Sequence, residues 1–224
     1  MSEHEPLQPL SASQREALEE ATTSYQAAVT ADAARWLVAR GLGKQAADTF
    51  RLGVVGNDPF PGHEKFRGWL AIPYLDRDNA PLTIRFRCLQ EHDHRALGHG
   101  KYMTLKDDPP RVFNIRAIHT AVDEIHIAEG EIDAMTLTLA GLLAIAIPGA
   151  NGWRAHHRRM LAGFSRTWSW GDPDAAGAEF NAKVMRSLRS AKGVRLREGD
   201  ANETYLAGGA EALHALVRPL ELAA

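Results

Sequence analysis

The spacing of hydrophobic positions predicts two parts of different architecture, and the change falls near residue 119. In the first part, apolar residues recur at helical spacing after a capping box at Ser13–Glu16, which predicts an N-terminal helix. Two strand-like runs, 68–75 and 82–89, are separated by turn-forming residues and predict a hairpin. Two further helices are expected over 33–40 and 44–50.

Beyond residue 119, short apolar runs alternate with longer amphipathic segments, which is typical of an α/β layer with a mostly parallel sheet flanked by helices. The predicted strands are 124–128, 142–147, 167–170 and 194–197. The predicted helices are 132–140, 156–162, 176–191, 203–206 and 210–216. The expected fold class is therefore α/β, divided into an N-terminal helical extension (1–24), a basic α+β lobe (25–118) and an α/β domain (119–224).

The bulk composition limits the classes of protein that the chain can represent. With 224 residues and 45% hydrophobic positions, the chain can bury a core. Its longest apolar run, 142–148, is far shorter than the roughly 20 residues of a membrane span. The acidic N-terminus lacks the order of a secretory signal, so a cytoplasmic protein with no membrane partner is expected. The single cysteine, Cys88, excludes an internal disulfide and any zinc module that needs two or four cysteine ligands.

The net charge of −2 conceals an uneven distribution along the chain. Residues 1–34 carry one basic and six acidic side chains, residues 35–118 carry 14 and nine, and residues 119–224 carry 11 and 13. The basic middle block is compatible with an ordinary solvated surface and also with a lobe that binds a polyanion.

Acidic residues follow three of the predicted strands. They are Glu129, the pair Asp172 and Asp174, and Asp200. Because the loops at the carboxyl edge of a parallel sheet converge on one crevice, these carboxylates are expected to lie together. Clustered carboxylates repel one another unless a cation neutralises them, and Mg²⁺ prefers oxygen ligands, so Mg²⁺ or Mn²⁺ is the expected cofactor. For each acid alone, a helix N-cap or a turn is the simpler interpretation, as for Asp174 before Gly177.

The acidic segments resemble the motifs of TOPRIM domains. Glu129-Gly130, followed by Asp133, resembles the first motif, and Asp172-Pro173-Asp174 with Gly177 resembles the Asp-x-Asp-x-x-Gly turn of the second. The Gly-containing loop after Ile147-Pro148 resembles the segment between the motifs, and the run that begins Asp200-Ala201-Asn202 resembles the acidic turn of primases. TOPRIM domains also occur in nucleases and topoisomerases, so the first part of the chain has to distinguish between them.

The first part resembles the small lobe that precedes TOPRIM in bacterial and phage primases of the DnaG type. The segments that carry this resemblance are 67–74, 83–89 and 101–103. Together the similarities cover about residues 25–216 and imply a DNA primase catalytic core that makes RNA primers on single-stranded DNA from NTPs. The resemblance implies Glu129, Asp172 and Asp174 as catalytic residues, and these with Asp200 and Asn202 as metal ligands. Asp133, one helical turn after Glu129, is expected to support them from the same face.

Basic residues are the candidates for nucleotide and DNA contacts. Alternation along strand 82–89 places Arg85 and Arg87 on one face, with Lys101 shortly after them. The resemblance favours Arg87 and Lys101 over Arg85. Arg154, with Arg158 and Arg159 at helical spacing, either guides the template or forms a plain basic helix surface.

The departures from the primase pattern concern partners and ligands. No segment resembles the zinc-binding or helicase domains of such primases, so a separate zinc-binding subunit and a replicative helicase are expected partners, and a phage or mobile element is the expected source. Pro173 stands where glycine is common, and Asn202 stands where cellular primases carry a second aspartate. The asparagine still offers an oxygen ligand.

A His-rich segment follows the second strand of the predicted hairpin. The side chains there that could bind zinc are Cys88, His92, His94 and His99. Their spacing matches no standard zinc module, so an exposed His-rich loop and no zinc are expected. Trp168 and Trp170 alternate within a predicted buried strand and are expected to pack in the core.

Two other functions compete with the primase interpretation. They are a TOPRIM metal-dependent nuclease and a non-catalytic replication accessory protein. A topoisomerase is disfavoured because it would need a larger gate and a separate tyrosine-bearing domain.

Overall fold

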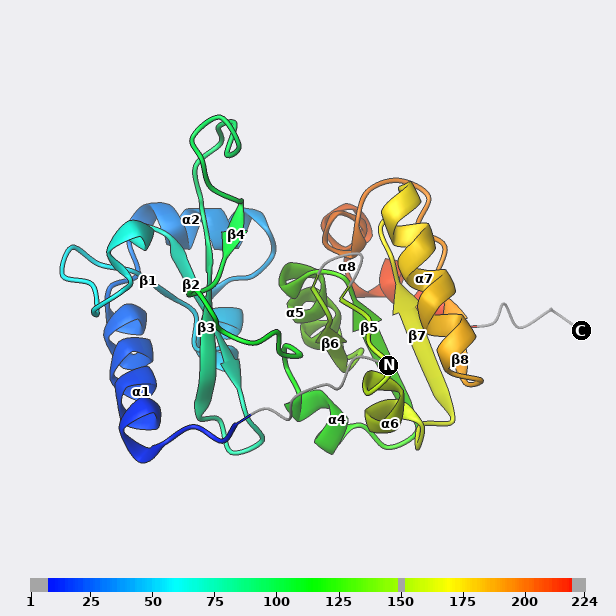
Figure 1. Ribbon diagram of the computed structural model, residues 1–224. Coiled ribbons are helices and arrows are strands. Elements are labelled where there is room, and N and C mark those ends of the chain that lie inside the picture. Colours follow the sequence, from blue (N-terminus) through cyan, green and yellow to red (C-terminus); the bar gives the residue numbers. More distant parts are fainter. Residues whose placement is uncertain (1–7, 149–151, 219–224) are drawn as a thin grey trace, which may run out of the picture. The chain divides into compact units, whose positions relative to one another are not determined.

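Two four-stranded sheets form the framework of the protein (Figure 1). The computed structural model describes residues 8–148 and 152–218, and its chain separates into two units. The first unit contains the chain up to Ala34 together with Ala47–Arg111, and the second contains Arg35–Ala46 and the chain from Val112 onward. Each sheet lies within one unit, and each unit is described separately below.

The first unit is built on an antiparallel sheet of order β1-β2-β3-β4. Its strands are β1 (Gly53–Val54), β2 (Leu70–Leu75), β3 (Pro81–Arg87) and β4 (Tyr102–Met103), and its other elements include α1 (Ala12–Ala27), α3 (Lys44–Thr49, which begins in the second unit) and the short 3-10 helix η1 (Glu64–Phe66). The predicted hairpin is confirmed as β2 and β3. The Asp76 carboxylate closes its turn by accepting hydrogen bonds from the backbone amides of Asp78 and Ala80, each 2.9 Å away.

Helix α1 packs on this sheet and belongs to its core. Ala21 and Tyr25 are buried against the aromatic residues Phe66 and Phe86, whose rings stack at 4.0 Å between centroids. The N-terminal helix is therefore part of the first unit, which differs from the expected separate extension over 1–24. The boundary before the second unit lies at Arg111/Val112 rather than after residue 118.

The capping box of α1 lies two residues before the predicted one. The Ser11 hydroxyl accepts a hydrogen bond from the Gln14 amide at 3.2 Å, and the Gln14 side chain accepts one from the Ser11 amide at 2.9 Å. The prediction of a box at Ser13–Glu16 was wrong because glutamine serves as well as glutamate at the third helical position.

The second unit is built on a parallel sheet of order β6-β5-β7-β8, as the strand and helix alternation predicts. Its strands are β5 (Glu124–Ala128), β6 (Ala144–Ala146), β7 (Arg166–Trp170) and β8 (Ala191–Gly193). Its helices are α4 (Arg116–Thr120), α5 (Glu131–Leu139), α6 (His157–Leu161), α7 (Ala175–Ser187) and α8 (Ala201–Val217), and α2 (Ala31–Ala39) spans the point where the chain enters it from the first unit.

Helices cover both faces of the parallel sheet. On one face, Ile125 and Ile127 of β5 pack with Leu161 of α6 and Phe180 of α7. The alternate residues of the strands point to the other face, which α5 covers, and α8 packs against α5. This arrangement explains why β6 is apolar and why every residue of β5 except Glu124 is buried.

Trp168 and Trp170 are both buried, so the prediction that they pack in the core is confirmed. The Trp170 indole donates a hydrogen bond of 2.9 Å to Nδ1 of His126 on β5. Burial, and to a lesser degree His214, lower the pKa of His126 to about 3. His126 is therefore a neutral acceptor in this layer.

One predicted element near the C-terminus was wrong in its bounds. The fourth strand covers Ala191–Gly193 instead of 194–197, because Val194 is buried beside it and donates its amide to Ser169 before the chain leaves the sheet. The two predicted helical pieces are confirmed, because α8 consists of two helical segments that meet at a kink at Gly209, whose φ is 66°. No helix of the described ranges is long and apolar enough to cross a membrane.

Candidate active site

The strand order places a topological switch point between β5 and β7. From β5 the chain first crosses to β6 on one side and then returns to β7 on the other. The connections that leave the carboxyl ends of β5 and β7 therefore diverge to opposite faces, which opens a crevice where ligands bind in sheets of this kind. Glu129 follows β5 directly, and Asp172 lies two residues after β7. The structure thus confirms the predicted positions of these acids at the edge of the sheet.

Glu129 is half-buried at this edge. Burial raises the pKa of its carboxyl to about 7, and the charges of Asp172 and Asp174 add to the effect. Its Oε1 atom is buried and has no hydrogen-bond partner among the described residues. A buried acceptor without a donor is costly unless a cation or a ligand satisfies it.

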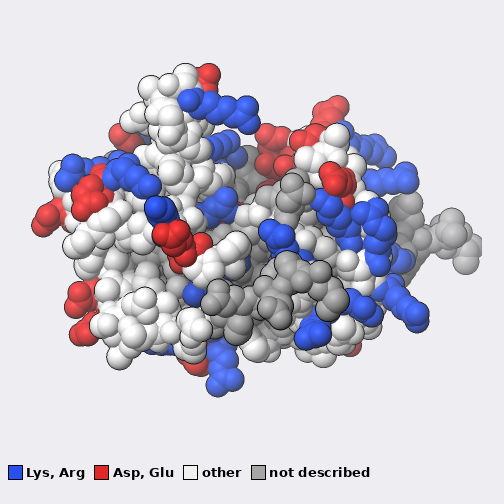
Figure 2. Space-filling model, viewed as in Figure 1, with Lys and Arg blue, Asp and Glu red and all other residues white. Residues whose placement is uncertain are grey.

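Asp172 lies within the same electrostatic group. Its pKa is raised first by burial and then by the charges of Asp200, Asp174 and Glu203. Because each of these acids acts on Asp172, the structure brings together the carboxylates that follow β5 and β7 with those at the start of α8. Figure 2 shows acidic side chains gathered at the upper end of α7 and α8 in that view.

Asp174 and Asp200 also cap helices, as the simpler interpretation of such acids would have it. Oδ1 of Asp174 accepts a hydrogen bond from the Gly177 amide at 2.8 Å, at the start of α7. Oδ1 of Asp200 accepts one from the Glu203 amide at 2.7 Å, at the start of α8. The caps fix one oxygen of each carboxylate and thereby orient the other.

Asp133 is buried in the first turn of α5 and is less accessible than the other acids of the group. Its pKa is raised by burial and by the nearby charges of Asp200 and Asp172. Its Oδ1 accepts a hydrogen bond from the backbone amide of Asn202 at 3.0 Å. These contacts place Asp133 under the acidic group, in the supporting position that its spacing predicts.

Asn202 is fully buried, and its side chain connects three parts of the second unit. Its amide nitrogen donates to the Arg40 carbonyl at 2.7 Å and to the Thr136 hydroxyl at 2.8 Å. Its Oδ1 has no hydrogen-bond partner within the described part of the chain. These contacts support a positioning role for Asn202, and the predicted role as a metal ligand stays a prediction that would use this oxygen.

Glycines of the second acidic motif allow two backbone segments to touch. A Cβ atom at Gly171 would lie 2.2 Å from the carbonyl oxygen of Gly177, and one at Gly177 would lie 2.1 Å from that of Asp172. Such distances are impossible for a real side chain, so this turn requires glycine at both positions. The corresponding loop after β6, around residues 149–151, lies outside the described residues.

The donors in this group suit a hard divalent cation. Glu129, Asp172, Asp174, Asp200 and Asn202 offer only oxygen, the ligand type of Mg²⁺ and Mn²⁺. Among the described residues no three of the carboxylates converge to within 4.8 Å of one another, whereas Cys88, His92 and His94 do. The acids therefore form an open group, which suits Mg²⁺ because this ion keeps several waters and shares its coordination with substrate phosphates.

The acidic group contains one member that the sequence interpretation did not select. Glu203 contributes to the raised pKa of Asp172, and its carboxylate folds back so far that a Cβ at Gly199 would lie 2.0 Å from Oε2. The sequence does contain a pattern that could have identified Glu203. In the spacing Asp200-x-x-Glu203, the side chain of the third helical residue folds back toward the N-cap residue.

Two of the predicted basic residues lie on one face of the first unit's sheet. The guanidinium carbons of Arg85 and Arg87 lie 4.9 Å and 4.8 Å from the centre of the Tyr102 ring. Arg87 also donates to the Tyr102 hydroxyl. The predicted shared face of Arg85 and Arg87 is confirmed, while Lys101 is exposed immediately before β4.

The basic residues near α6 form a separate surface in the second unit. A depression of about 610 Å³ is lined by Ala155, Arg158, Arg159, Ala162, Arg186 and Ser187. Arg154 is exposed just before α6, and its backbone amide donates to Nδ1 of His157 at 3.0 Å. The predicted basic helix surface is thus present and includes a residue of α7.

Comparison with known sequences relates this chain to a bacteriophage protein. It is 35% identical over 153 residues to the gene 57 protein of Mycobacterium phage D29, a match that covers 66% of this chain and 97% of the phage protein. The chain belongs to the family of this gene 57 protein. No protein-family model matches the sequence.

Comparison with solved structures shows the fold of this gene 57 family member. The RNA polymerase domain of Mycobacterium tuberculosis primase DnaG matches with a TM-score of 0.75 and 21% identity, covering 92% of this chain and 83% of that one. A DnaG primase catalytic domain bound to ssDNA matches with a TM-score of 0.70 and 17% identity, covering 90% and 76%. The primase fragment of the bacteriophage T7 primase-helicase protein matches with a TM-score of 0.62 and 19% identity, covering 81% and 73%. The chain therefore has the fold of a DnaG-type primase catalytic core, as its TOPRIM-like motifs predict.

Proposed function

We propose that the protein is the catalytic subunit of a phage DNA primase, which synthesises RNA primers on single-stranded DNA by metal-dependent nucleotidyl transfer in the bacterial cytoplasm. The observation that carries this proposal is the group of mutually interacting carboxylates at the switch point of a primase-type fold. Glu129 and Asp172 have raised pKa values because they are buried near other acids. Such a group favours binding of a cation that neutralises its charge.

The cation would be held by oxygen ligands from three loops. Asp172, Asp174 and Asp200 would bind it together with Glu129, and Asn202 could add its amide oxygen. When bound, Mg²⁺ or Mn²⁺ supplies charge neutralisation at the reacting phosphates and lowers the pKa of a coordinated hydroxyl. Asp133 would act on these ligands through its contact with the start of α8 and is therefore a positioning residue.

The reaction needs a proton acceptor as well as a charged site. A primer 3′-hydroxyl attacks the α-phosphate of an incoming NTP, the new bond forms between O3′ and the α-phosphorus, and pyrophosphate leaves. The pKa of about 7 at Glu129 lies near the operating pH, which is the range in which a carboxylate best accepts a proton. Glu129 is therefore proposed as a ligand, as the acceptor of the hydroxyl proton, or as both.

Basic side chains of the two units would bind the nucleic acid and the nucleotide. Arg85 and Arg87 form a basic face around Tyr102, in which Arg85 is partly exposed and Arg87 is buried, and Lys101 precedes Tyr102 in the chain. Arg154 and the basic surface near α6 supply further positive charge in the second unit. Guanidinium groups suit phosphate because they form paired, charge-assisted hydrogen bonds. A replicative helicase is the proposed partner because a phage protein of this fold carries both activities in its name, and a separate zinc-binding subunit stays a prediction from the resemblance.

The test is extension of a short primer annealed to single-stranded DNA, with labelled ribonucleotides and Mg²⁺ or Mn²⁺. The annealed primer removes the need for initiation, so the assay measures the catalytic core alone. Asp172→Asn should reduce the rate of extension by more than the ~10–100-fold that is typical when a group that only supports a metal ligand is lost. Asp123→Asn is the matched control, since Asp123 is an exposed aspartate outside the acidic group.

Other outcomes of the same assay would replace the proposal. Metal-dependent cleavage of the strand that needs Asp172, without extension, would identify a TOPRIM nuclease. Nucleotide or DNA binding with neither extension nor cleavage, also with an annealed primer, would identify a non-catalytic accessory protein.

A further inference from the structure

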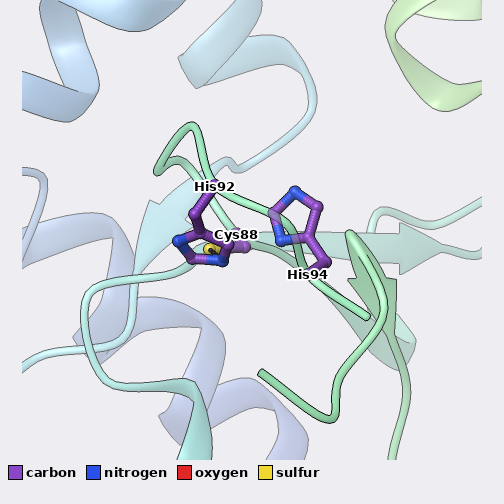
Figure 3. A group of neighbouring side chains, drawn as sticks. All are labelled: Cys88, His92 and His94. Carbon is purple, nitrogen blue, oxygen red and sulfur yellow. Dashed lines mark hydrogen bonds between the residues drawn. The ribbon is translucent and has the colours of Figure 1, made fainter. Parts of the chain in front are cut away.

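A second group of potential metal ligands lies in the first unit. Its ligand atoms are sulfur and nitrogen, whereas the acidic group offers only oxygen. Cys88 is the residue that follows β3, and His92 and His94 come from the loop that connects β3 to β4. One ligand atom of each lies within 4.8 Å of the others (Figure 3). The picture shows the His92 ring over the cysteine sulfur and the His94 ring beside it. Thiolate and imidazole are the ligands that Zn²⁺ prefers.

One separation between potential ligand atoms matches that in a tetrahedral site. Sγ of Cys88 lies 3.7 Å from Nε2 of His92. Ligands at the usual Zn–S and Zn–N lengths, about 2.3 Å and about 2.0–2.1 Å, lie roughly 3.6 Å apart when the angle between them is tetrahedral. The two atoms thus already stand at the edge length of a zinc tetrahedron.

A third histidine lies next to this group. The His99 ring centre is 5.1 Å from that of His92 and 5.3 Å from that of His94, while His92 and His94 are 4.4 Å apart. Nδ1 of His99 lies 3.1 Å from the Gly100 carbonyl. Because a carbonyl can only accept, Nδ1 carries the proton, and Nε2 keeps the lone pair that binds a metal. Such a backbone contact is how proteins commonly orient a histidine ligand.

The histidines are held in place by the loop and are not extended into solvent. All three are partly buried, and Cys88 is buried. The loop is closed by a backbone hydrogen bond of 3.0 Å from His99 to the His94 carbonyl, and the Asp93 side chain accepts from the amides of Arg95 and Ala96. The ring of Trp69 on the neighbouring segment lies 5.0 Å from that of His99.

One ring nitrogen in the group has no partner that the structure records. Nδ1 of His94 is buried and forms no hydrogen bond with any described residue. A buried ring nitrogen that lacks a partner and lies beside a cysteine sulfur is available to coordinate a metal.

We propose that Cys88, His92 and His94 bind a Zn²⁺ ion, with His99 as the fourth ligand. Although a standard zinc module has a recognisable spacing, the fold brings these residues together without one, so the expectation of no zinc in this chain is replaced. The ion would attach the loop between β3 and β4 to the end of β3, the strand that carries Arg85 and Arg87. This site is independent of the Mg²⁺ group and of the proposed primase activity.

The binding experiment uses the full chain, stripped of metal and titrated with Co²⁺ as a spectroscopic substitute for Zn²⁺. We expect one tight site with thiolate-to-cobalt charge-transfer absorption and the intense visible bands of tetrahedral coordination, displaced by Zn²⁺ and unaffected by millimolar Mg²⁺. Cys88→Ser should remove the charge-transfer band, and His94→Asn should weaken Zn²⁺ binding by more than tenfold. His99→Asn should weaken it as well. His119→Asn, at an exposed histidine of α4, is the matched control and should change nothing.

Stability measurements separate loss of the site from loss of the fold. Circular dichroism of each metal-free variant establishes that it folds, and Zn²⁺ should raise the melting temperature of the native chain but not of Cys88→Ser or His94→Asn. His94→Asn in the loop gives this information even if replacing the buried cysteine unfolds the chain. Absence of tight Co²⁺ binding, or binding that survives both Cys88→Ser and His94→Asn, would overturn the proposal. Binding that is lost in Asp172→Asn would assign the metal to the acidic group instead, and unchanged affinity in His99→Asn would exclude His99 as a ligand.

Discussion

The backbone amide of Asn202 donates a hydrogen bond of 3.0 Å to Oδ1 of Asp133 and thereby connects the first turn of α8 to the first turn of α5. The two residues are 69 positions apart in the chain. Through this contact, the helix that Asp200 caps is positioned relative to the loop that carries Glu129. The geometry of the proposed metal site therefore depends on a pair of residues that need not touch the metal.

Replacing Asn202 by alanine should lower the free energy of unfolding and should have only a small effect on metal affinity. The change leaves the Arg40 carbonyl and the Thr136 hydroxyl without their donor, and each buried unsatisfied group costs about 1–3 kcal/mol. Chemical denaturation should show this loss. Isothermal titration with Mg²⁺ or Mn²⁺ should show a smaller change for Asn202→Ala than for Asp172→Asn. An equal loss of metal affinity in both variants would instead make Asn202 a direct ligand.

The sequence was informative where function depends on local position. The acids after β5 and β7 lie at the predicted edge of the sheet, because a strand followed by Glu-Gly or by an Asp-x-Asp-x-x-Gly turn determines where its carboxylates emerge. The shared face of Arg85 and Arg87 followed from strand alternation in the same way.

Contacts between distant segments could not be predicted in that way. The side chain of Asn202 reaches the carbonyl of Arg40, 162 residues away, and no local pattern contains that information. The His-rich loop is largely exposed, as predicted, and zinc was not expected there because the ligand spacing matches no standard module. Backbone hydrogen bonds within the loop nevertheless bring histidine rings beside Cys88. The fourth strand was placed too late because the buried Val194, just after it, resembles a strand residue in its hydrophobicity.

A methyl group at Gly177 should disrupt the second acidic motif. The new Cβ would lie 2.1 Å from the carbonyl oxygen of Asp172, and this contact is with backbone that cannot rotate away. Gly177→Ala should lower the free energy of unfolding by more than the ~1–3 kcal/mol typical of an overpacked side chain and should abolish primer extension. Gly163→Ala is the control, since a Cβ atom added at Gly163 would meet no described atom within 4 Å. A Gly177→Ala protein of native stability and activity would contradict the tight turn.

Stabilisation by Mg²⁺ should increase with pH. The folded-state pKa of Glu129, about 7, lies above its ordinary value of 4.5, and the pKa of Asp172 is also raised. An acid whose pKa is raised by folding contributes stability below its unfolded pKa, and this contribution is lost as pH rises through the folded pKa. Between about pH 5 and pH 8 the metal-free protein should therefore lose stability, on the order of 1–2 kcal/mol for the half-exposed Glu129.

Melting curves at pH 5.5 and pH 8, with Mg²⁺ and with a chelator, measure this linkage. The difference between the two conditions should be larger at pH 8, where the carboxylates are charged, and should shrink in Asp172→Asn. His126 has the opposite effect on stability, because its lowered pKa makes the folded protein less stable at acidic pH. Comparing the melting temperatures with Mg²⁺ and with a chelator at the same pH cancels this effect. A shift caused by Mg²⁺ that is equal at both pH values would contradict the proposed acidic site.

The basic face around Tyr102 should contribute to DNA affinity through charge. If Arg85 contacts one phosphate, Arg85→Gln should reduce the slope of log K against log salt by about 0.7, the value for one contact with a single strand. Lys101→Gln should have a similar effect. Arg77→Gln is the matched control because the Arg77 side chain is 70% exposed and lies 3.4 Å from Asp78, in the turn between β2 and β3. Fluorescence anisotropy with a labelled single strand between low and moderate salt gives the slopes. Equal slopes for Arg85→Gln, Lys101→Gln and the native protein would remove this face from the DNA-binding surface and leave the basic depression near α6 as the surface to test next.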